Sequence, residues 1–278
     1  MNDSDTSDKS SVRTLSEAFL SQLISDLDDN SVRAIILHGS YARGDACPPY
    51  SDVDLIRITK ETPEQTQQKK FLWRDGYLLN LSSRPLSIYK EWLKTPEEAI
   101  FRIQSIREAR ILLDKDGAFH TFQQEAGNWK WEPLQEAANV YASQLLLEQT
   151  EIILKILRAI QEPDVVVLIE MIMLDLLSDI TEAVAVQQGI LVKSGDSYLR
   201  QVQETVGLNS AWTHYYMSVV GESIEVPSLT IEKKGVAALR LYQETVQLLQ
   251  PSLLPEHRKV IEQSMRVVEQ VLSNKDAL

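Results

Sequence analysis

Two carboxylates, Asp52 and Asp54, lie two positions apart in the segment DVDLIRIT, residues 52–59. This segment alternates polar and apolar residues over most of its length and predicts a β-strand. Side chains at positions i and i+2 of a strand leave the same face, with Cα atoms roughly 6–7 Å apart. Two such carboxylates repel one another unless a cation lies between them, and Mg²⁺ binds one or two carboxylates together with substrate phosphates. The pair is therefore a candidate magnesium site.

A glycine–serine turn, GSYARG at residues 39–44, precedes this strand. It follows the run VRAIILH, whose apolar and β-branched residues predict a strand that ends at the turn. Gly39 lets backbone N–H groups approach a ligand without an intervening Cβ, and Ser40 adds a hydroxyl. If a helix begins there, its N-terminus presents unpaired N–H groups to an anion, and Arg43 adds a fixed positive charge. A phosphate cradle beside a magnesium carboxylate pair predicts a nucleoside triphosphate site.

The two half-motifs, LHGS at 37–40 and DVD at 52–54, are separated by eleven residues. In this order and spacing they resemble the nucleotidyltransferase superfamily typified by DNA polymerase β. The variant GSYARG followed by SDVD looks like its bacterial small-substrate branch, the kanamycin and other aminoglycoside nucleotidyltransferases. The resemblance implies a nucleotidyltransferase domain followed by a helical domain, with Mg²⁺ as cofactor and ATP or another nucleoside triphosphate as co-substrate. The acid pair would hold Mg²⁺, and Gly39, Ser40 and Arg43 would bind the nucleotide.

The same family usually carries a third carboxylate on a later strand of the sheet. The candidate strand here, GYLLNLS at residues 76–82, contains no acid. Depending on the register, the third position is Asn80 or Leu78. Asn80 could accept a bond from a metal-bound water, whereas Asp75 precedes the strand and is a poorer geometric candidate. This departure puts two-metal catalysis in doubt.

The elements that must position these residues change in type near residue 127. We expect a disordered tail at 1–11, a nucleotidyltransferase domain with a mixed sheet at 12–127, and a helical bundle that binds the acceptor or a partner at 128–278, which together make an α+β fold. The segment before Trp129 is the expected linker region. Expected strands are 32–38, 52–59, 109–113 and a hairpin of 71–73 with 77–83 around Asp75-Gly76. Expected helices are 12–27, 85–94, 96–106, 133–161, 164–188, 196–206, 209–220, 230–249 and 254–273.

Helix 164–188 carries Asp175, Asp179 and Glu182 at positions i, i+4 and i+7, so the three acids share one stripe. Either this stripe is the solvated face of the helix, or it binds a cationic acceptor and supplies a general base. In enzymes resembling kanamycin nucleotidyltransferase, a glutamate of the helical domain takes the proton from the acceptor hydroxyl. By its place on the stripe we assign that role to Asp179. Glu170 lies off the stripe and is either a buried acid with a raised pKa or a solvated residue at the helix rim.

The charge of the 278-residue chain is uneven: the formal charge of −12 divides into −3 for residues 1–130 and −9 for residues 131–278. An acidic chain repels phosphate backbones, so we expect no nucleic-acid partner. The single cysteine, Cys47, excludes an internal disulfide framework. The polar N-terminus is not a signal peptide, and the longest apolar run is too short and too charged to span a membrane. We therefore expect a cytoplasmic protein, and leave a homodimer open.

These features favour an enzyme that transfers a nucleoside monophosphate to a hydroxyl of a small acceptor. The acidic second half favours a cationic acceptor such as an aminoglycoside. Two alternatives stay open. Without the third acid, the chain could be an inactive or weakly active nucleotide-binding or regulatory module, or its helical domain could dock a protein that is nucleotidylated.

Overall fold

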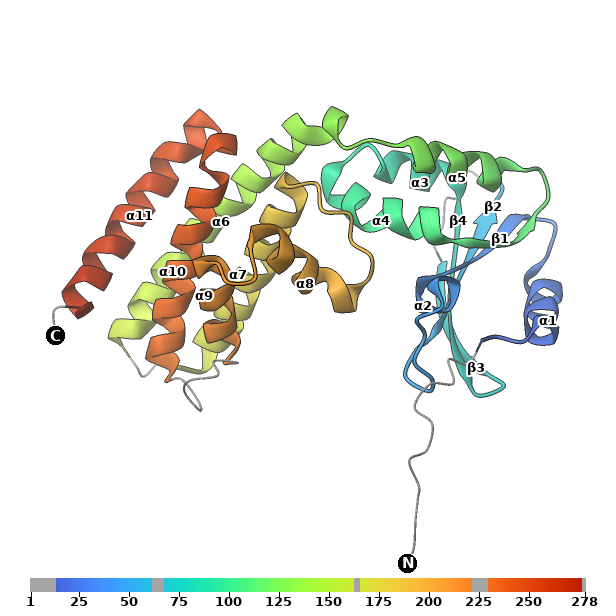
Figure 1. The fold of residues 1–278 in the computed structure, drawn as a ribbon, viewed down its shortest axis with the longest axis horizontal. Helices are drawn as coiled ribbons and strands as arrows, with labels where there is room; N and C mark the ends of the chain where they lie inside the picture. The colour runs from blue at the N-terminus through green and yellow to red at the C-terminus, as the bar shows by residue number, and fades with distance from the viewer. Residues whose placement is uncertain (1–13, 62–67, 163–165, 222–229, 277–278) are drawn as a thin grey trace, which may run out of the picture. The chain divides into compact units, whose positions relative to one another are not determined.

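Residues 14–61, 68–162, 166–221 and 230–276 are described by the structure, a computed structural model. Within them the chain divides into two compact units (Figure 1). The first contains the chain up to Lys94 together with Phe101–Lys130, and the second contains Thr95–Ile100 and the chain from Trp131 onward. The tail expected at residues 1–11 lies outside the described residues.

The first unit is built on a five-stranded sheet with the order β3-β4-β2-β1-β5. Its strands are β1 (Val32–His38), β2 (Val53–Thr59), β3 (Gln68–Arg74), β4 (Tyr77–Pro85) and β5 (Arg110–Asp114). The pairing of β2 with β4 is parallel and the other three pairings are antiparallel. The sheet is therefore mixed, as predicted. The β3–β4 hairpin turns at Asp75 and Gly76, both with positive φ (49° and 82°), which is the backbone that a two-residue type I′ turn requires.

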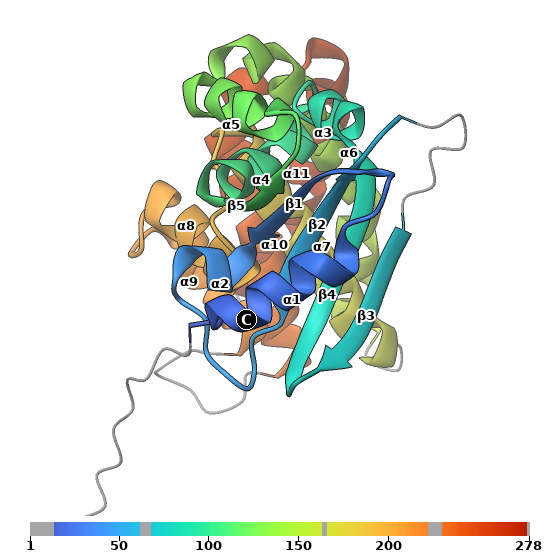
Figure 2. The ribbon, with the colours of Figure 1, turned by 90° about the vertical axis from the view of Figure 1, so that its right-hand side faces the viewer.

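Helices cover both faces of this sheet, as Figure 2 shows for α1 on the near face. Helix α1 (Glu17–Leu27) packs its buried leucines against apolar side chains of β1, β2 and β4. The other face of the sheet lines a pocket. Across this pocket lie residues of α3 (Leu86–Trp92), α4 (Pro96–Glu108) and α5 (Ala118–Asn128). The short helix α2 (Gly39–Arg43) lies between β1 and β2 in sequence.

The second unit is helical. Its main helices are α6 (Gln135–Gln161), α7 (Val166–Gln187), α8 (Gly195–Val206), α9 (Ala211–Val220), α10 (Ile231–Leu249) and α11 (Pro255–Asp276). Helices α6, α7 and α10 contact one another and bury residues such as Leu146, Leu176 and Leu239 completely. A mixed sheet followed by a helical region confirms the predicted α+β class.

Two local expectations differ from the structure. Helix α1 begins at Glu17 rather than at residue 12, because the hydroxyl of Ser16 accepts the Phe19 N–H at 3.2 Å and caps the helix. The segment before Trp129, where we expected a linker, contains helix α5, which buries Phe119, Phe122 and Ala126. Among the described residues, no helix is both long and apolar enough to cross a membrane.

Candidate active site

The alternation of side chains along β2 places Asp54 on the face of the sheet that α1 does not cover. Val53 and Leu55 are completely buried against α1, so the side chain of Asp54, between them, leaves the other face of the sheet. Asp52 lies two residues earlier, just before the strand begins. Both acids therefore lie at the start of β2, the central strand of the sheet.

Burial and mutual repulsion raise the pKa of the Asp54 carboxyl to about 6. Burial is the larger cause, and the negative charge of Asp52 is the next. A hydrogen bond from Asn80 and the positive charges of Lys69 and Arg43 act in the opposite direction. A nearby positive charge would therefore stabilise the ionised form of the Asp54 carboxylate.

Asn80 lies beside Asp54 on the neighbouring strand β4. In the parallel β2–β4 pairing, Asp54 is aligned with Asn80, and the Asn80 Nδ2 donates a hydrogen bond of 2.7 Å to the Asp54 Oδ1. Of the two registers that the sequence left open, the structure therefore has the one with Asn80, not Leu78, beside the acid. Asp75 is exposed in the hairpin turn.

The glycine–serine turn comes into direct contact with this acid. Gly39 has φ +69°, and a Cβ built on it would lie 2.3 Å from the Asp54 Oδ2. Only glycine fits this position, because an L side chain would meet both backbone strain and the carboxylate. Ser40 is the next residue of α2, and Gly44 ends that short helix in the left-handed conformation. The structure thus brings the two half-motifs together.

Arg43, the third nucleotide-binding candidate, is at the end of α2. Its Nε donates to the Asp45 Oδ2 at 3.0 Å, and its charge lowers the pKa of both Asp54 and His38. The guanidinium therefore acts on the acid site while a salt bridge to the neighbouring loop fixes its orientation.

The donor set suits one divalent cation. Among the described residues, no three His, Cys, Asp or Glu side chains gather in a metal-binding cluster. Asp52 and Asp54 supply two hard oxygen donors, and the absence of a Cβ on Gly39 lets the Asp54 Oδ2 approach the turn that would carry the phosphates. Because Mg²⁺ binds through one or two carboxylates plus phosphate oxygens, these residues fit Mg²⁺ that arrives with a nucleotide, and would hold it through the acid pair.

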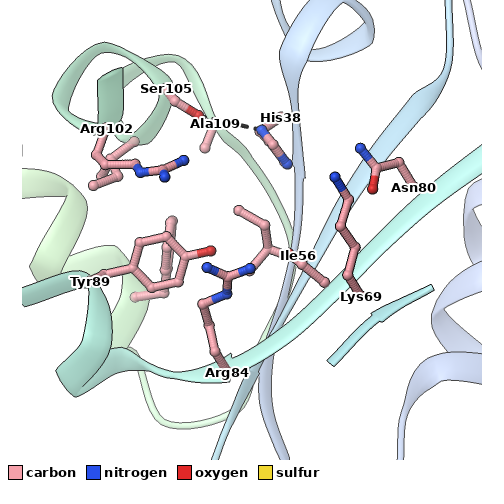
Figure 3. Close-up of a pocket in the computed structure, with 12 residues that line it drawn as sticks. His38, Ile56, Lys69, Asn80, Arg84, Tyr89, Arg102, Ser105 and Ala109 are labelled. Atoms are coloured by element: carbon pink, nitrogen blue, oxygen red, sulfur yellow. Dashed lines mark hydrogen bonds between the residues drawn. The ribbon is translucent and has the colours of Figure 1, made fainter. Parts of the chain in front are cut away.

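A basic pocket extends from this site along the same face of the sheet (Figure 3). Its lining includes Asn80, His38 and three cationic residues, Lys69, Arg84 and Arg102. Burial and the charges of Arg102, Arg43 and Arg84 lower the pKa of His38 to about 4, so the imidazole is neutral near pH 7.

Our sequence analysis missed the three cations of this pocket. Arg84 follows Asn80 by four residues on β4, so strand alternation could have placed both on one face. Lys69 is aligned with Ser82 of that face across the hairpin. Arg102 comes from helix α4, and no spacing in the sequence connects it to the strands.

The acids of the second unit are mostly engaged within that unit. The Gln149 Nε2 donates to the Asp179 Oδ2 at 2.6 Å, and burial is the main reason that the pKa of Asp179 is raised. The Tyr141 hydroxyl donates to the Glu182 Oε1 at 2.7 Å. Asp175 is exposed.

Glu170 requires a correction. The alternative in which it is a buried acid is wrong, because its side chain is 56% exposed. It lies 3.6 Å from the Nζ of Lys234 on α10. The position off the acidic stripe places it at the solvated rim of α7 and not in the core.

Comparison with known proteins shows which class of domain the first unit resembles. Residues 20–113 match the model of the nucleotidyltransferase domain family. The chain also resembles the crystal structure of a nucleotidyltransferase-like protein from Exiguobacterium sibiricum 255-15, with a TM-score of 0.51 and 14% sequence identity over 90% of this chain and 78% of that one. No curated protein matches the chain. The chain thus has a nucleotidyltransferase-like α+β fold, and residues 20–113 of its first unit are similar to a nucleotidyltransferase domain, which supports nucleotidyl transfer as the class of activity.

Proposed function

We propose that the protein transfers a nucleoside monophosphate from ATP or another nucleoside triphosphate to a hydroxyl of a small acceptor. The observation that carries this proposal is the contact of Gly39 with the half-buried carboxylate of Asp54 beside Asp52. It joins a turn suited to phosphate with a pair of acids suited to Mg²⁺ in one place. Nucleotidyl transfer requires positioning and charge stabilisation more than covalent help from the protein.

The residues of the first unit have distinct tasks in this proposal. Asp52 and Asp54 would hold Mg²⁺, which when bound offsets the negative charge on the reacting phosphate and the departing pyrophosphate. Gly39 and Ser40 would orient the phosphates through the turn, and Arg43 would add positive charge. Asn80 holds the Asp54 carboxylate in place through its amide.

The acceptor and the general base are assigned from charge and from the family resemblance. The second half of the chain carries a charge of −9, which favours a cationic acceptor such as an aminoglycoside. Asp179 is our candidate for the base, because burial raises its pKa toward the range in which a carboxylate accepts a proton effectively. Asp175, Glu182 and Glu170 are weaker acceptor-binding candidates, since Glu182 and Glu170 already have partners in their own unit.

Pyrophosphate release tests this function. The purified protein is incubated with ATP, Mg²⁺ and a panel of amino sugars, with Asp54→Asn as the inactive reference. We expect release that depends on Mg²⁺, on one class of acceptor and on Asp54. If folded wild-type protein releases no pyrophosphate with any nucleotide or acceptor, the transferase proposal is wrong.

The amide of Asn80 at the third acid position favours a second candidate function, nucleotide binding without turnover. In that case calorimetry would detect Mg²⁺-dependent nucleotide binding by a protein that releases no pyrophosphate. Asn80→Asp is then the informative variant, because it restores a carboxylate beside Asp54 in a register that the structure defines. Turnover that appears only in Asn80→Asp would support the binding module, and turnover in the wild type would eliminate it.

A further inference from the structure

The pocket beside Asn80 concentrates positive charge. It has a volume of about 300 Å³ and is lined by residues of the sheet and of α3, α4 and α5. Figure 3 shows the guanidinium groups of Arg84 and Arg102 and the amino group of Lys69 pointing toward the same space. None of the residues that line it is an acid. Three cations around one space repel one another, and an anion between them would relieve that repulsion.

Aromatic rings hold the two arginines in place. The Arg84 guanidinium carbon lies 5.7 Å from the ring centroid of Tyr89 and 4.8 Å from that of Trp92, and that of Arg102 lies 4.5 Å from the Trp92 centroid. Stacking on a ring fixes the plane of a guanidinium, and the N–H groups at its edge form bidentate hydrogen bonds. The Arg84 Nε is buried and has no hydrogen-bond partner among the described residues. An oxygen of a ligand in the pocket would satisfy this buried donor.

Lys69 is the third cationic residue that lines the pocket. Neither Lys69 nor Arg84 forms an ion pair with any carboxylate in the described part of the chain. Hydroxyl groups of Ser82 and Ser105 add donors to the lining. Two planar guanidinium groups and an ammonium match the several oxygens of a phosphate dianion better than the two oxygens of a single carboxylate.

The pocket is larger than a free phosphate ion and only part of its wall is polar. Its volume corresponds to about ten water-sized groups, at about 30 Å³ each. Ile56, Ile106 and Phe119 provide apolar surface away from the cations. Phosphate oxygens would contact the basic side, and a short carbon chain would contact these apolar residues.

We propose that this pocket binds a small phosphomonoester of about ten non-hydrogen atoms. The ligand is distinct from the nucleotide of the proposed function, because none of Gly39, Ser40, Arg43, Asp52 and Asp54 lines the pocket. This inference goes beyond the proposed function and does not require it. The pocket adjoins the acid site through Asn80, which lines the one and bonds to the other.

Calorimetric titration with glycerol 3-phosphate tests the proposal, without Mg²⁺ or nucleotide in the buffer. We expect one molecule bound per chain, weaker binding of inorganic phosphate and no binding of glycerol. Lys69→Gln should weaken the binding of glycerol 3-phosphate about tenfold, because a charged hydrogen bond is lost. Lys70→Gln is the matched control and should change nothing, since Lys70 is aligned with Leu81, on the α1 side of the sheet.

A second variant covers the deeper part of the pocket. Arg84→Gln should weaken binding more than Lys69→Gln, and circular dichroism would establish that it remains folded. If Arg84→Gln unfolds, the Lys69 and Lys70 pair alone still decides the outcome. Failure of glycerol 3-phosphate to bind, or equal effects of the two lysine variants, would overturn the proposal.

Two further arms identify the source of the phosphate group. In Asp54→Asn the binding of glycerol 3-phosphate should persist while Mg²⁺-dependent ATP binding is lost, so failure of the acid site and failure of the pocket are distinguishable. Wild-type protein saturated with ATP and Mg²⁺ should still bind glycerol 3-phosphate. Stoichiometric displacement of glycerol 3-phosphate by ATP would show that the pocket is part of the nucleotide site. Equally tight binding of inorganic phosphate would show that the apolar wall contributes nothing to binding. Either result would contradict the proposal.

Discussion

Asp54 in the sheet and Asp179 in the helical unit are both carboxylates whose pKa is raised mainly by burial. They differ in the charges that surround them. Lys69 and Arg43 act on Asp54 together with the negative Asp52. The charges that act on Asp179 come from other acids, Asp175 and Glu148. The sheet site can therefore receive a cation together with a polyanion, whereas the surroundings of Asp179 favour positive charge alone.

The partners of the two acids differ in the same way. Asp54 is fixed by strand register and by the turn at Gly39, so its position follows from two short motifs. Asp179 is fixed by a hydrogen bond from Gln149, on a different helix. Two short motifs on strands therefore determine where Asp54 lies, whereas the neighbours of Asp179 depend on how the helices of the bundle pack.

The largest expected effect is on the sheet side of this comparison. Asp54→Asn should lower the rate of pyrophosphate release about 10²–10³-fold, because loss of the charged ligand weakens the stabilisation of the reacting phosphate. Steady-state kinetics at saturating Mg²⁺ measures it. Asp75→Asn, which changes an acid in the exposed turn of the β3–β4 hairpin, should retain full activity. Equal rates for Asp54→Asn and wild type would remove the acid pair from the mechanism.

A pair of variants tests the helical side. If Asp179 is the base, Asp179→Asn should lower kcat about 10²-fold, with little change in nucleotide binding. Glu182→Gln, on the same stripe, should have a much smaller effect, because its partner Tyr141 can still donate to the amide oxygen. Similar small effects of both variants would mean that the stripe is structural and that the base lies elsewhere.

Gly39→Ala and Gly44→Ala separate backbone strain from contact with the acid. Both glycines have positive φ, but a Cβ at Gly44 would meet nothing within 4 Å. Alanine in this region costs about 1–2 kcal/mol at either position. Only Gly39→Ala should also displace the Asp54 carboxylate and abolish Mg²⁺-dependent nucleotide binding. Chemical denaturation measures the first effect and calorimetry the second, and equal calorimetric results for the two variants would contradict the contact.

The smallest expected effect concerns pH. The folded-state pKa of Asp54, about 6, lies above its ordinary value of 3.8, so the folded state binds the proton more tightly than the unfolded state does. The resulting stability is fully present below about pH 4 and is lost as the pH rises through 6. Relative to Asp54→Asn, wild-type protein should therefore gain stability between pH 7 and pH 5.

Unfolding midpoints of the two proteins across this range measure the difference without metal. Added Mg²⁺ should reduce it, because a bound cation favours the ionised carboxylate. Parallel pH profiles for wild type and Asp54→Asn would show that the pKa of Asp54 is not raised in the folded state.

Much of the first unit was predictable because its signals are local. Alternation gave the strands, and Asp75-Gly76 gave the hairpin turn. The choice between Asn80 and Leu78 was not predictable, since it depends on the parallel pairing of strands that are 26 residues apart. The basic pocket was missed for a similar reason, because it needs the packing of helix α4 onto the sheet.

In the second unit, periodicity predicted helices but not their surroundings. The spacing of Asp175, Asp179 and Glu182 is correct for one stripe of α7, yet the partners of Asp179 and Glu182 both come from α6. Helical periodicity shows which residues share a face, and the neighbour of that face is decided by tertiary packing.

The parallel pairing of β2 with β4 also couples ligand binding to folding. Asp54 and Asn80 meet only when the long-range contacts of the sheet have formed. Forming these contacts costs entropy, because the chain between the two strands must close into a loop. A nucleotide held there would bind the folded sheet and not the unfolded chain, and at 100 times its dissociation constant it would add about 2.7 kcal/mol to the stability of this unit. Nucleotide concentration would then set how long the sheet survives heating or proteolysis.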